Sequence, residues 1–371
     1  MKTIEPTELR DRLTAGEPVE VVDIREEPEF RSWHILGSRN VPVYDALRND
    51  DPSALVDASR GLPRDRSIVT VCRAGVMSQR AAQLLESLGF RTESLAGGIR
   101  GWGGVWTEAR IDWPSSPAAT LVQIRRNGKG CLSYLFGANG RAAVVDPSVE
   151  TGAYTAAAHR AGLEIAYVLE THVHADHLSR ARQLASTTGA TLILPPNDRV
   201  RFDYTPMPDG ATIDVGGIRV EAVATPGHTG ESTCYLVGTD LLLTGDTLFV
   251  ERVGRPDLEK GDAGAEAGAR LLYRSLHALL ERFDDVRILP AHTADPVGFD
   301  GVPVAATLAE VRDGLSVTRE DEERFVQRIV QSLEAKPPNH ESVIAVNEGR
   351  ESLEGIDPLD LEAGPNRCAA G

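Results

Sequence analysis

Thr171-His172-Val173-His174-Ala175-Asp176-His177 is the stretch that decides the fold of this chain. It places three imidazoles and a carboxylate within six residues, directly after the apolar run Ile165-Ala166-Tyr167-Val168-Leu169-Glu170. Polar side chains at the end of a buried strand are costly to bury unless they coordinate something, and imidazoles and carboxylates are common metal ligands. The stretch therefore predicts a metal site.

Three further potential ligands lie later in the chain, each after an apolar run. They are His228 in Thr225-Pro226-Gly227-His228-Thr229, Asp246 in Leu243-Thr244-Gly245-Asp246-Thr247, and His292 in Leu289-Pro290-Ala291-His292. A single histidine is more often structural than ligating. Five histidines and two aspartates at strand ends instead favour one metal centre that is assembled from separate loops.

The size and charge of the chain narrow its class. Its 371 residues suit two domains, and its 41% hydrophobic residues can form cores. No run approaches the roughly 18 apolar residues of a membrane span, and the start, MKTIEPTELRDRL, has no apolar signal core. The formal charge of -16 argues against a nucleic-acid partner, which requires clustered basic residues. We therefore expect a cytoplasmic protein that binds neither nucleic acid nor membrane.

The chain contains four cysteines, Cys72, Cys131, Cys234 and Cys368. They are too few and too scattered for a disulfide framework or a Cys-x-x-Cys zinc site, so a functional cysteine should act as a thiol. Cys131 and Cys234 stand in apolar strand contexts and are predicted to be core residues, and the closeness of Cys234 to His228 in sequence leaves a sulfur-relay role open as the alternative for Cys234. Cys368, near the end of the chain, is predicted to be inert.

The rhythm of the sequence divides the chain into two domains. Residues 1–112 alternate short apolar runs with helical patterns, as in a small α/β domain with a parallel sheet. Trp113-Pro114-Ser115-Ser116-Pro117 breaks this pattern, and we place a linker at 113–118. Residues 119–371 contain more strand-like runs than helical ones, which predicts two sheets flanked by helices. The acidic tail from 348 onward is expected to pack only locally.

Cys72 closes a predicted strand at 67–71 and precedes a loop, Arg73-Ala74-Gly75-Val76-Met77-Ser78, where a helix is predicted to begin. Unpaired backbone N–H groups and the positive end of the helix dipole stabilise a thiolate or a bound anion at such a place. These features suit a nucleophilic sulfur. A small buried hydrophobe is the alternative interpretation.

Residues 4–108 resemble a single-domain rhodanese. The resemblance depends on Val21-Val22-Asp23-Ile24-Arg25, His34 to Pro42, the Cys72 loop, and Leu95 to Trp102. It implies that Cys72 carries sulfane sulfur as a persulfide, with Arg73, Gly75 and Ser78 binding the substrate. Met77 stands where arginine is common in that family, which favours a less charged donor than thiosulfate, such as an organic persulfide. Asp23 and Arg25 are predicted to form a structural ion pair.

Residues 118–371 resemble the metallo-β-lactamase superfamily, which implies an αββα sandwich. Two chemistries compete within it. In the hydroxyacylglutathione hydrolases all of the ligands hold two metals that activate water against a thioester. In the persulfide dioxygenases one Fe(II) is held, here by His172, His228 and Asp246. The remaining polar residues would then surround the ligands and orient them; these residues are His174, Asp176, His177 and His292.

The sequence segments around the ligands resemble the persulfide dioxygenases more than the hydroxyacylglutathione hydrolases. Gly254-Arg255-Pro256-Asp257-Leu258 and the ending Gly364 to Ala369 look like segments of that family, and the long helical extension of the hydrolases is not evident. The resemblance implies that Arg255 contacts a substrate carboxylate. A surface ion pair between Arg255 and Asp257 is the alternative.

The sequence therefore predicts a rhodanese fused to an Fe(II) persulfide dioxygenase, with one iron per chain. The expected small-molecule partners are a thiol persulfide, O₂, and sulfite or thiosulfate, and a homodimer is the default assembly. The carrier thiol stays open between glutathione, coenzyme A and others. One alternative is a two-zinc thioester hydrolase of the glyoxalase II kind, and another is a non-enzymatic sulfur carrier or sensor.

Overall fold

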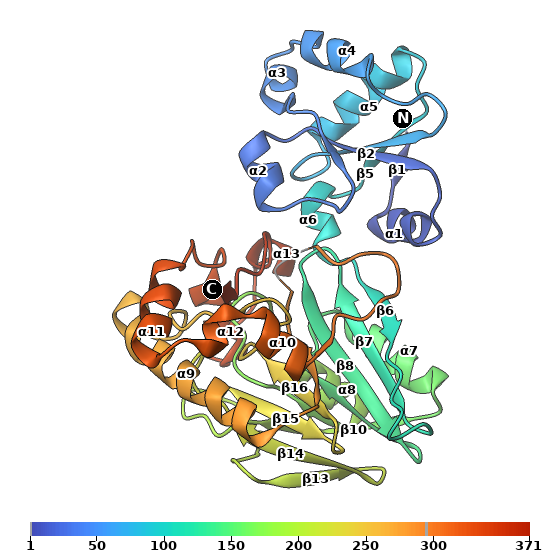
Figure 1. The fold of residues 1–371 in the computed structure, drawn as a ribbon. Coiled ribbons are helices and arrows are strands. Elements are labelled where there is room, and N and C mark those ends of the chain that lie inside the picture. Colours follow the sequence, from blue (N-terminus) through green and yellow to red (C-terminus); the bar gives the residue numbers. More distant parts are fainter. Residues whose placement is uncertain (1, 294–295) are drawn as a thin grey trace.

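The computed structural model describes residues 2–293 and 296–371. Figure 1 shows a smaller N-terminal domain, in blue, that stands on a larger domain containing the rest of the chain. Among the described residues, no helix is both long enough and apolar enough to cross a membrane.

The N-terminal domain is built on one five-stranded sheet in the order β1-β5-β4-β2-β3, with every neighbouring pair parallel. Its strands are β1 Thr3–Ile4, β2 Val19–Asp23, β3 Arg39–Asn40, β4 Ser67–Val71 and β5 Thr92–Leu95. Its helices are α1 Pro6–Thr14, α2 Glu27–Ser32, α3 Tyr44–Arg48, α4 Ser53–Ser59, α5 Met77–Ser87 and α6 Gly98–Trp102. Separate apolar clusters fill the two faces of the sheet. The predicted parallel α/β domain is confirmed.

The larger domain contains two facing sheets. The first has the order β12-β11-β10-β9-β8-β7-β6 and the second the order β13-β14-β15-β16-β18-β19. The strands of the first sheet are β6 Thr107–Arg110, β7 Thr120–Arg126, β8 Cys131–Ala138, β9 Arg141–Val145, β10 Glu164–Leu169, β11 Thr191–Leu194 and β12 Thr205–Pro206. Those of the second are β13 Thr212–Val215, β14 Ile218–Ala224, β15 Thr233–Val237, β16 Leu241–Gly245, β18 Arg287–Pro290 and β19 Ala306–Thr307.

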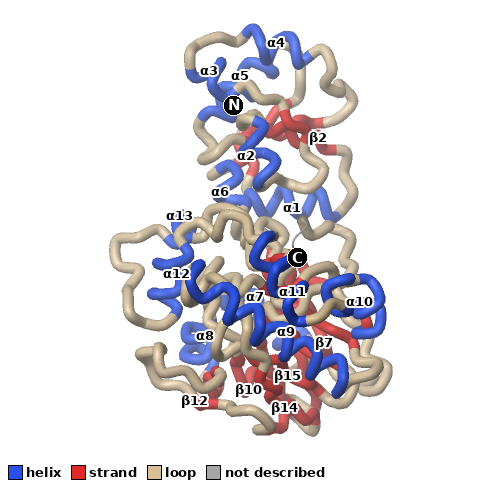
Figure 2. The backbone as a smooth tube through the Cα atoms, turned by 60° about the vertical axis from the view of Figure 1, so that its left-hand side comes forward, coloured by secondary structure: helices blue, strands red, loops and turns tan. Residues whose placement is uncertain are grey.

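Helices cover both outer faces of this sandwich. An apolar cluster between the sheets joins residues of both, and one further cluster lies under the helices on each side. The first sheet carries α7 Thr151–Arg160 and α8 Ala181–Thr188, and the second carries α9 Ala265–Arg282, α10 Leu308–Gly314 and α11 Glu322–Gln331. In Figure 2, α9 and α11 pass in front of the strands. The predicted αββα sandwich is confirmed.

The predicted domain boundary requires a correction. β6 lies within the predicted first domain, yet it pairs antiparallel with β7 of the second, as in the pair Arg110 and Val122. The predicted linker at 113–118 is therefore the turn between two paired strands. Trp113 in this turn is buried, and its indole Nε1 donates to Asp240 Oδ1 at 2.9 Å. The boundary lies between α6 and β6.

The tail is also more integrated than predicted. After α12 His340–Asn347 and α13 Pro358–Leu361, the chain ends in β20 Ala369–Ala370, which pairs with β17 Val253–Gly254. Glu362 and Cys368 are buried. The lack of periodicity after residue 348 reflects irregular backbone, and this backbone nevertheless packs against the sandwich.

The two domains contact each other through specific polar groups. Trp33 Nε1 donates to the carbonyl oxygen of Gly128 at 2.6 Å, and Arg126 Nε donates to that of Gly103 at 2.8 Å. Arg100 of α6 forms an ion pair with Asp360 of α13 at 2.8 Å. These contacts place α2 and α6 of the first domain against the loops and the tail of the second.

Candidate metal centre

Three predicted ligands meet at the ends of strands from both sheets. His172 follows β10, His228 follows β14, and Asp246 follows β16. The distance to Asp246 Oδ2 is 3.7 Å from His172 Nε2 and 3.5 Å from His228 Nε2, and the three ligand atoms lie within 4.8 Å of one another. All three residues are buried, and none of these three atoms has a hydrogen-bond partner among the described residues. Buried ligand atoms that converge on one point and lack hydrogen-bond partners are well placed to bind a metal ion.

In each ligand the second ring nitrogen or carboxylate oxygen forms a hydrogen bond with a neighbouring residue. This bond fixes the direction of the ligand atom that has no partner. His172 Nδ1 donates to Thr171 Oγ1 at 2.9 Å, and His228 Nδ1 donates to the carbonyl oxygen of Arg255 at 2.7 Å. Asp246 Oδ1 accepts from His292 Nδ1 at 2.6 Å. Such outer contacts orient metal ligands and set the histidine tautomer, so both Nε2 lone pairs point to the same place.

The electrostatics of the three ligands favour the protonation states that bind metals. Burial lowers the pKa of His172 well below its usual range, and His174 and His228 lower it further. Burial likewise lowers the pKa of His228. Burial alone would raise the pKa of Asp246, but the adjacent His292 outweighs this effect and lowers it. The site therefore offers two neutral imidazoles and one carboxylate.

His174 does not join this triad. Its Nε2 lies 2.8 Å from Glu170 Oε2 and 3.3 Å from Asp146 Oδ1. Burial lowers the pKa of His174, but these two carboxylates outweigh burial and raise the pKa well above its usual range. The ring is therefore held as an imidazolium by Asp146 and Glu170, and neither of these two carboxylates was among the predicted site residues.

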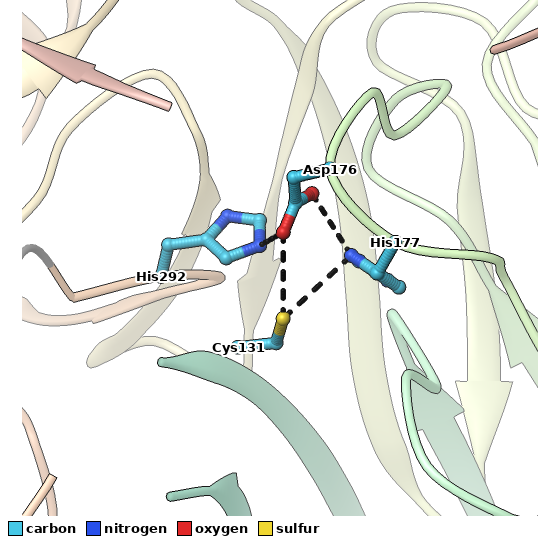
Figure 3. Close-up of side chains that lie close together, drawn as sticks. All are labelled: Cys131, Asp176, His177 and His292. Carbon is cyan, nitrogen blue, oxygen red and sulfur yellow. Dashed lines mark hydrogen bonds and ion pairs between the residues drawn. The ribbon is translucent and has the colours of Figure 1, made fainter. Parts of the chain in front are cut away.

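The remaining predicted residues form a second cluster beside the triad, with one unpredicted member, Cys131 (Figure 3). Asp176 lies at its centre, with Oδ1 3.0 Å from His177 Nδ1 and Oδ2 3.1 Å from His292 Nε2. Cys131 Sγ lies 3.4 Å from Asp176 Oδ2 and 3.8 Å from His177 Nδ1. The four ligand atoms lie within 4.8 Å of one another, so this cluster can also hold a metal ion.

His292 connects the two groups of ligands. It bridges Asp176 and Asp246, and although burial lowers the pKa of its imidazole, these carboxylates raise it well above its usual range. Burial and Asp176 raise the pKa of the Cys131 thiol, but His177 and His292 bring it down to about 7. The His292 imidazole therefore lies between two carboxylates that favour its charged form.

Two cysteines lie closer to this centre than predicted. Cys131 was expected only in the core, but backbone pairing of β8 with the segment after β18 places it beside His292. Cys368 was expected to be inert near the terminus, but its sulfur lies within 4.8 Å of ligand atoms of Asp246 and His292. Pairing between segments so far apart in sequence leaves no local signal. Cys234, as predicted, packs in an apolar cluster, and burial raises its pKa to about 11.

Arg255 is fully engaged by protein groups. It forms a two-pronged pair with Asp257 at 2.7 and 3.0 Å, and it donates to the carbonyl oxygens of Glu334, Ala335 and Arg367. The ion pair named as the alternative is therefore present, and it is buried rather than on the surface. The contact of Arg255 with a substrate carboxylate stays a prediction.

The sulfur site of the first domain is separate. Cys72 follows β4 and is buried; Gly75 N donates to its sulfur at 3.2 Å, and its thiol donates to Ser78 Oγ at 3.3 Å. α5 begins at Met77 with no side-chain cap, so its first N–H groups face this loop. Gly75 and Ser78 thus surround the sulfur.

The two arginines of the first domain that have predicted roles both form ion pairs. Arg73 pairs with Glu29 at 2.6 and 2.7 Å and lies over the ring of Tyr44. Its predicted contact with substrate stays a prediction. The buried Arg25 pairs with Asp23 at 2.6 Å, as predicted.

Comparison with known proteins agrees with this architecture. Residues 5–104 match the rhodanese-like domain, and residues 126–293 match the metallo-beta-lactamase superfamily. The uncharacterized protein ML0493 of Mycobacterium leprae is 35% identical over 34% of this chain and 67% of its own length. A hydroxyacylglutathione hydrolase of Pseudomonas entomophila is 36% identical over 32% of this chain, and the match spans 47% of the hydrolase.

Two crystal structures resemble the larger domain. ETHE1 from Myxococcus xanthus is 26% identical with a TM-score of 0.54, over 62% of this chain and 98% of that protein. A metallo-beta-lactamase from Staphylococcus aureus is 26% identical with a TM-score of 0.57, over 62% of this chain and 72% of that protein. The chain therefore belongs to the metallo-beta-lactamase superfamily and carries a rhodanese-like domain at residues 5–104.

Proposed function

We propose that this protein oxidises a low-molecular-weight thiol persulfide with O₂ and that its rhodanese-like domain transfers sulfane sulfur through Cys72. In the oxidation R–S–SH, O₂ and water give R–SH, sulfite and two protons. The S–S bond breaks, and the sulfane sulfur loses the four electrons that O₂ accepts. The proposal goes beyond the family assignment, because that superfamily also contains hydrolases.

The observation that carries the proposal is the set of three orphaned ligand atoms. His172, His228 and Asp246 offer two imidazoles and one carboxylate, which is the ligand set of non-haem Fe(II) oxygenases. Iron held there would supply open positions for the persulfide sulfur and O₂. His174 lies outside this group of ligand atoms: its Nε2 contacts Glu170 and Asp146, and its Nδ1 has no hydrogen-bond partner among the described residues.

The residues around the triad have definable roles in this reaction. Arg255 O fixes the ring of His228, and Thr171 Oγ1 fixes that of His172. His292, as an imidazolium between Asp176 and Asp246, holds a proton beside the ligand carboxylate. All of these groups are buried, which keeps bulk water from the ligands.

Cys72 would take the sulfane sulfur in a second reaction. Its thiolate attacks R–S–SH, a Cys72 S–S bond forms, and R–SH leaves; sulfite then takes the sulfur as thiosulfate and restores the thiol. Gly75 N and the N-terminus of α5 stabilise the negative charge on sulfur. Because the oxidation produces the sulfite that this step consumes, the two domains suit each other chemically.

A two-zinc thioester hydrolase is the second candidate. The cluster of Cys131, Asp176, His177 and His292 favours it, because those ligand atoms can hold another metal. The hydrolase relative of Pseudomonas entomophila, matched over about half its length, points the same way.

Metal analysis combined with an oxygen electrode tests the proposal. Protein purified without oxygen and supplied with glutathione persulfide should contain one iron per chain and consume O₂ as sulfite appears, and Asp246→Ala should abolish both. Two zincs per chain with thioester hydrolysis and no O₂ uptake would establish the hydrolase instead. Sulfur loading on Cys72 without either activity would leave the third alternative, a sulfur carrier.

A further inference from the structure

The two domains enclose a cavity of about 540 Å³ whose lining includes neither Cys72 nor the triad of His172, His228 and Asp246. One wall is the end of α2 and the residues after it, up to His34, from the rhodanese-like domain. The other wall comes from the larger domain: the turn after β7, the segment around β17, and the end of the tail. The volume is in the range of small-molecule sites.

The lining of this cavity is basic, in a chain whose net charge is -16. Its basic residues are Arg31, His34, Lys129, Arg252, Arg255 and Arg367. Arg255 is neutralised by Asp257 and Arg31 pairs with Glu27, so within the described part of the chain the unpaired positive charge comes from Lys129, Arg252 and Arg367. Glu334 is the one acidic residue among the described lining residues, and it is exposed. A concentration of positive charge against the overall sign favours an anionic ligand.

Lys129 is the most informative of these residues. It is buried, and its Nζ donates at 3.0 Å to two carbonyl oxygens, those of Glu362 and Gly364. No carboxylate of the described residues lies within 4.0 Å of it. An ammonium group has three donors, so one is left over, and a buried charge without a counter-ion is costly. An anion in the cavity would supply both the acceptor and the charge.

Two arginines beside Lys129 also have no carboxylate of the described residues within this distance. Arg367 donates to Ser32 Oγ at 2.9 Å across the domain interface, and Arg252 is exposed at the rim. A guanidinium matches an oxyanion with two parallel hydrogen bonds. The cavity therefore combines one buried point charge with guanidinium groups.

The cavity also lies between the two chemical centres. On one side, Glu29 of α2 pairs with Arg73, the neighbour of Cys72. On the other side, the lining residues Gly130, Thr293 and Arg367 are each one residue from Cys131, His292 and Cys368. The first-domain wall of the cavity is thus linked to the Cys72 loop through α2, and the opposite wall is adjacent in sequence to residues of the metal centre.

We propose that this interdomain cavity binds a small oxyanion of the sulfur chemistry on either side of it. The oxyanion group has two possible sources: an inorganic sulfur oxyanion, sulfite or thiosulfate, or the carboxylates of the thiol that carries the persulfide. The assignment of these ligands rests on the proposed function, whereas the preference for an oxyanion rests on the charge of the cavity. Both domains contribute, so the site exists only in the fused chain.

Calorimetric titration of the full chain at low ionic strength tests the proposal. One arm uses sulfite and thiosulfate, and the other uses reduced glutathione; the arm that binds identifies the source. Lys129→Gln and Arg252→Gln should each weaken binding by roughly tenfold or more, since each removes a charged hydrogen-bond donor. Arg31→Gln should weaken it too, because the first domain forms one wall. Arg110→Gln removes the same charge from an exposed position on β6 and should bind as the wild type does.

The proposal is overturned if the wild-type chain binds none of the three anions, or if the cavity variants bind like Arg110→Gln. Arg252 is exposed, so its variant keeps the test valid even if Lys129→Gln does not fold. Oxygen uptake and thiosulfate formation are measured separately. Anion binding that the cavity variants weaken supports the site even where both activities are absent, and that absence alone would refute the proposed function.

Discussion

Glu362 should be the residue that fixes the tail to the metal centre, and Glu362→Gln tests this. Its buried carboxylate accepts from Arg126 at 3.0 and 3.3 Å, from Arg180 at 3.1 Å, and from the backbone N–H of Leu178 at 2.8 Å. Leu178 directly follows the histidine motif. One side chain from the tail thus stabilises the loop that contains the ligands.

The magnitude follows from the pKa of this carboxyl group. Burial raises it, but Arg126 and then Arg180 outweigh burial and lower the pKa from its usual 4.5 to about 2. At about 1.36 kcal/mol per pKa unit, the charged form stabilises the folded state by about 3 kcal/mol. Because the folded pKa is the lower one, this stabilisation is fully present above about pH 4.5 and disappears as the pH falls towards 2.

Urea unfolding at pH 7 measures the effect. Glu362→Gln leaves the buried Arg126 without its carboxylate, so the free energy of unfolding should fall by about 3 kcal/mol. Glu341→Gln makes the same change at an exposed position of α12 and should cost less than about 0.5 kcal/mol. A loss below about 1 kcal/mol for Glu362→Gln, or a difference that does not shrink between pH 5 and about pH 3, would refute the reasoning.

Three further predictions concern the two centres. His174→Gln should keep nearly the wild-type iron content, since His174 lies outside the group of three ligand atoms and its Nε2 contacts Glu170, whereas His172→Gln should lose iron; equal loss in both would place His174 among the ligands. Cys72→Ser should abolish thiosulfate formation from persulfide and sulfite while O₂ uptake continues, and retained transfer would exclude Cys72. Arg255→Gln should lower the melting temperature, because it removes the two-pronged partner of the buried Asp257 and leaves only Lys336 at 3.8 Å, at a cost of about 3 kcal/mol. An unchanged melting temperature with a higher KM for persulfide would instead support a substrate contact.

The parts of the fold that were predicted correctly carry local signals. α5 follows its pattern closely: the apolar spacing from Ser78 to Leu88, with Gly89 after it, predicts a helix, and α5 spans Met77–Ser87. The ligands could be found because each histidine or aspartate follows an apolar run, and strand ends on one edge converge. The apolar run over 213–224 predicts one strand, but it contains a turn at Gly216 and Gly217, both with positive φ, and divides into β13 and β14.

What could not be predicted depends on pairing between distant segments. Cys131 reaches the metal centre because the start of β8 pairs with the backbone at His292. Glu170 and Asp146 hold His174 because β9 and β10 are neighbours in the sheet, and nothing in either strand marks these carboxylates as partners of one ring. Side-chain directions of this kind decide which imidazoles are free for a metal, so sequence alone left the one-metal and two-metal alternatives open.

The strand β6 has a consequence for dividing the protein. Its residues reach the edge of the sandwich before the chain turns back at Trp113, so a larger domain that begins at residue 119 would expose the backbone of β7 along its whole pairing edge. Unpaired edges of this kind recruit other chains. A separated larger domain should therefore begin before Thr107; one that begins at 119 should self-associate, with a second β7 in the place that β6 occupies in the intact protein.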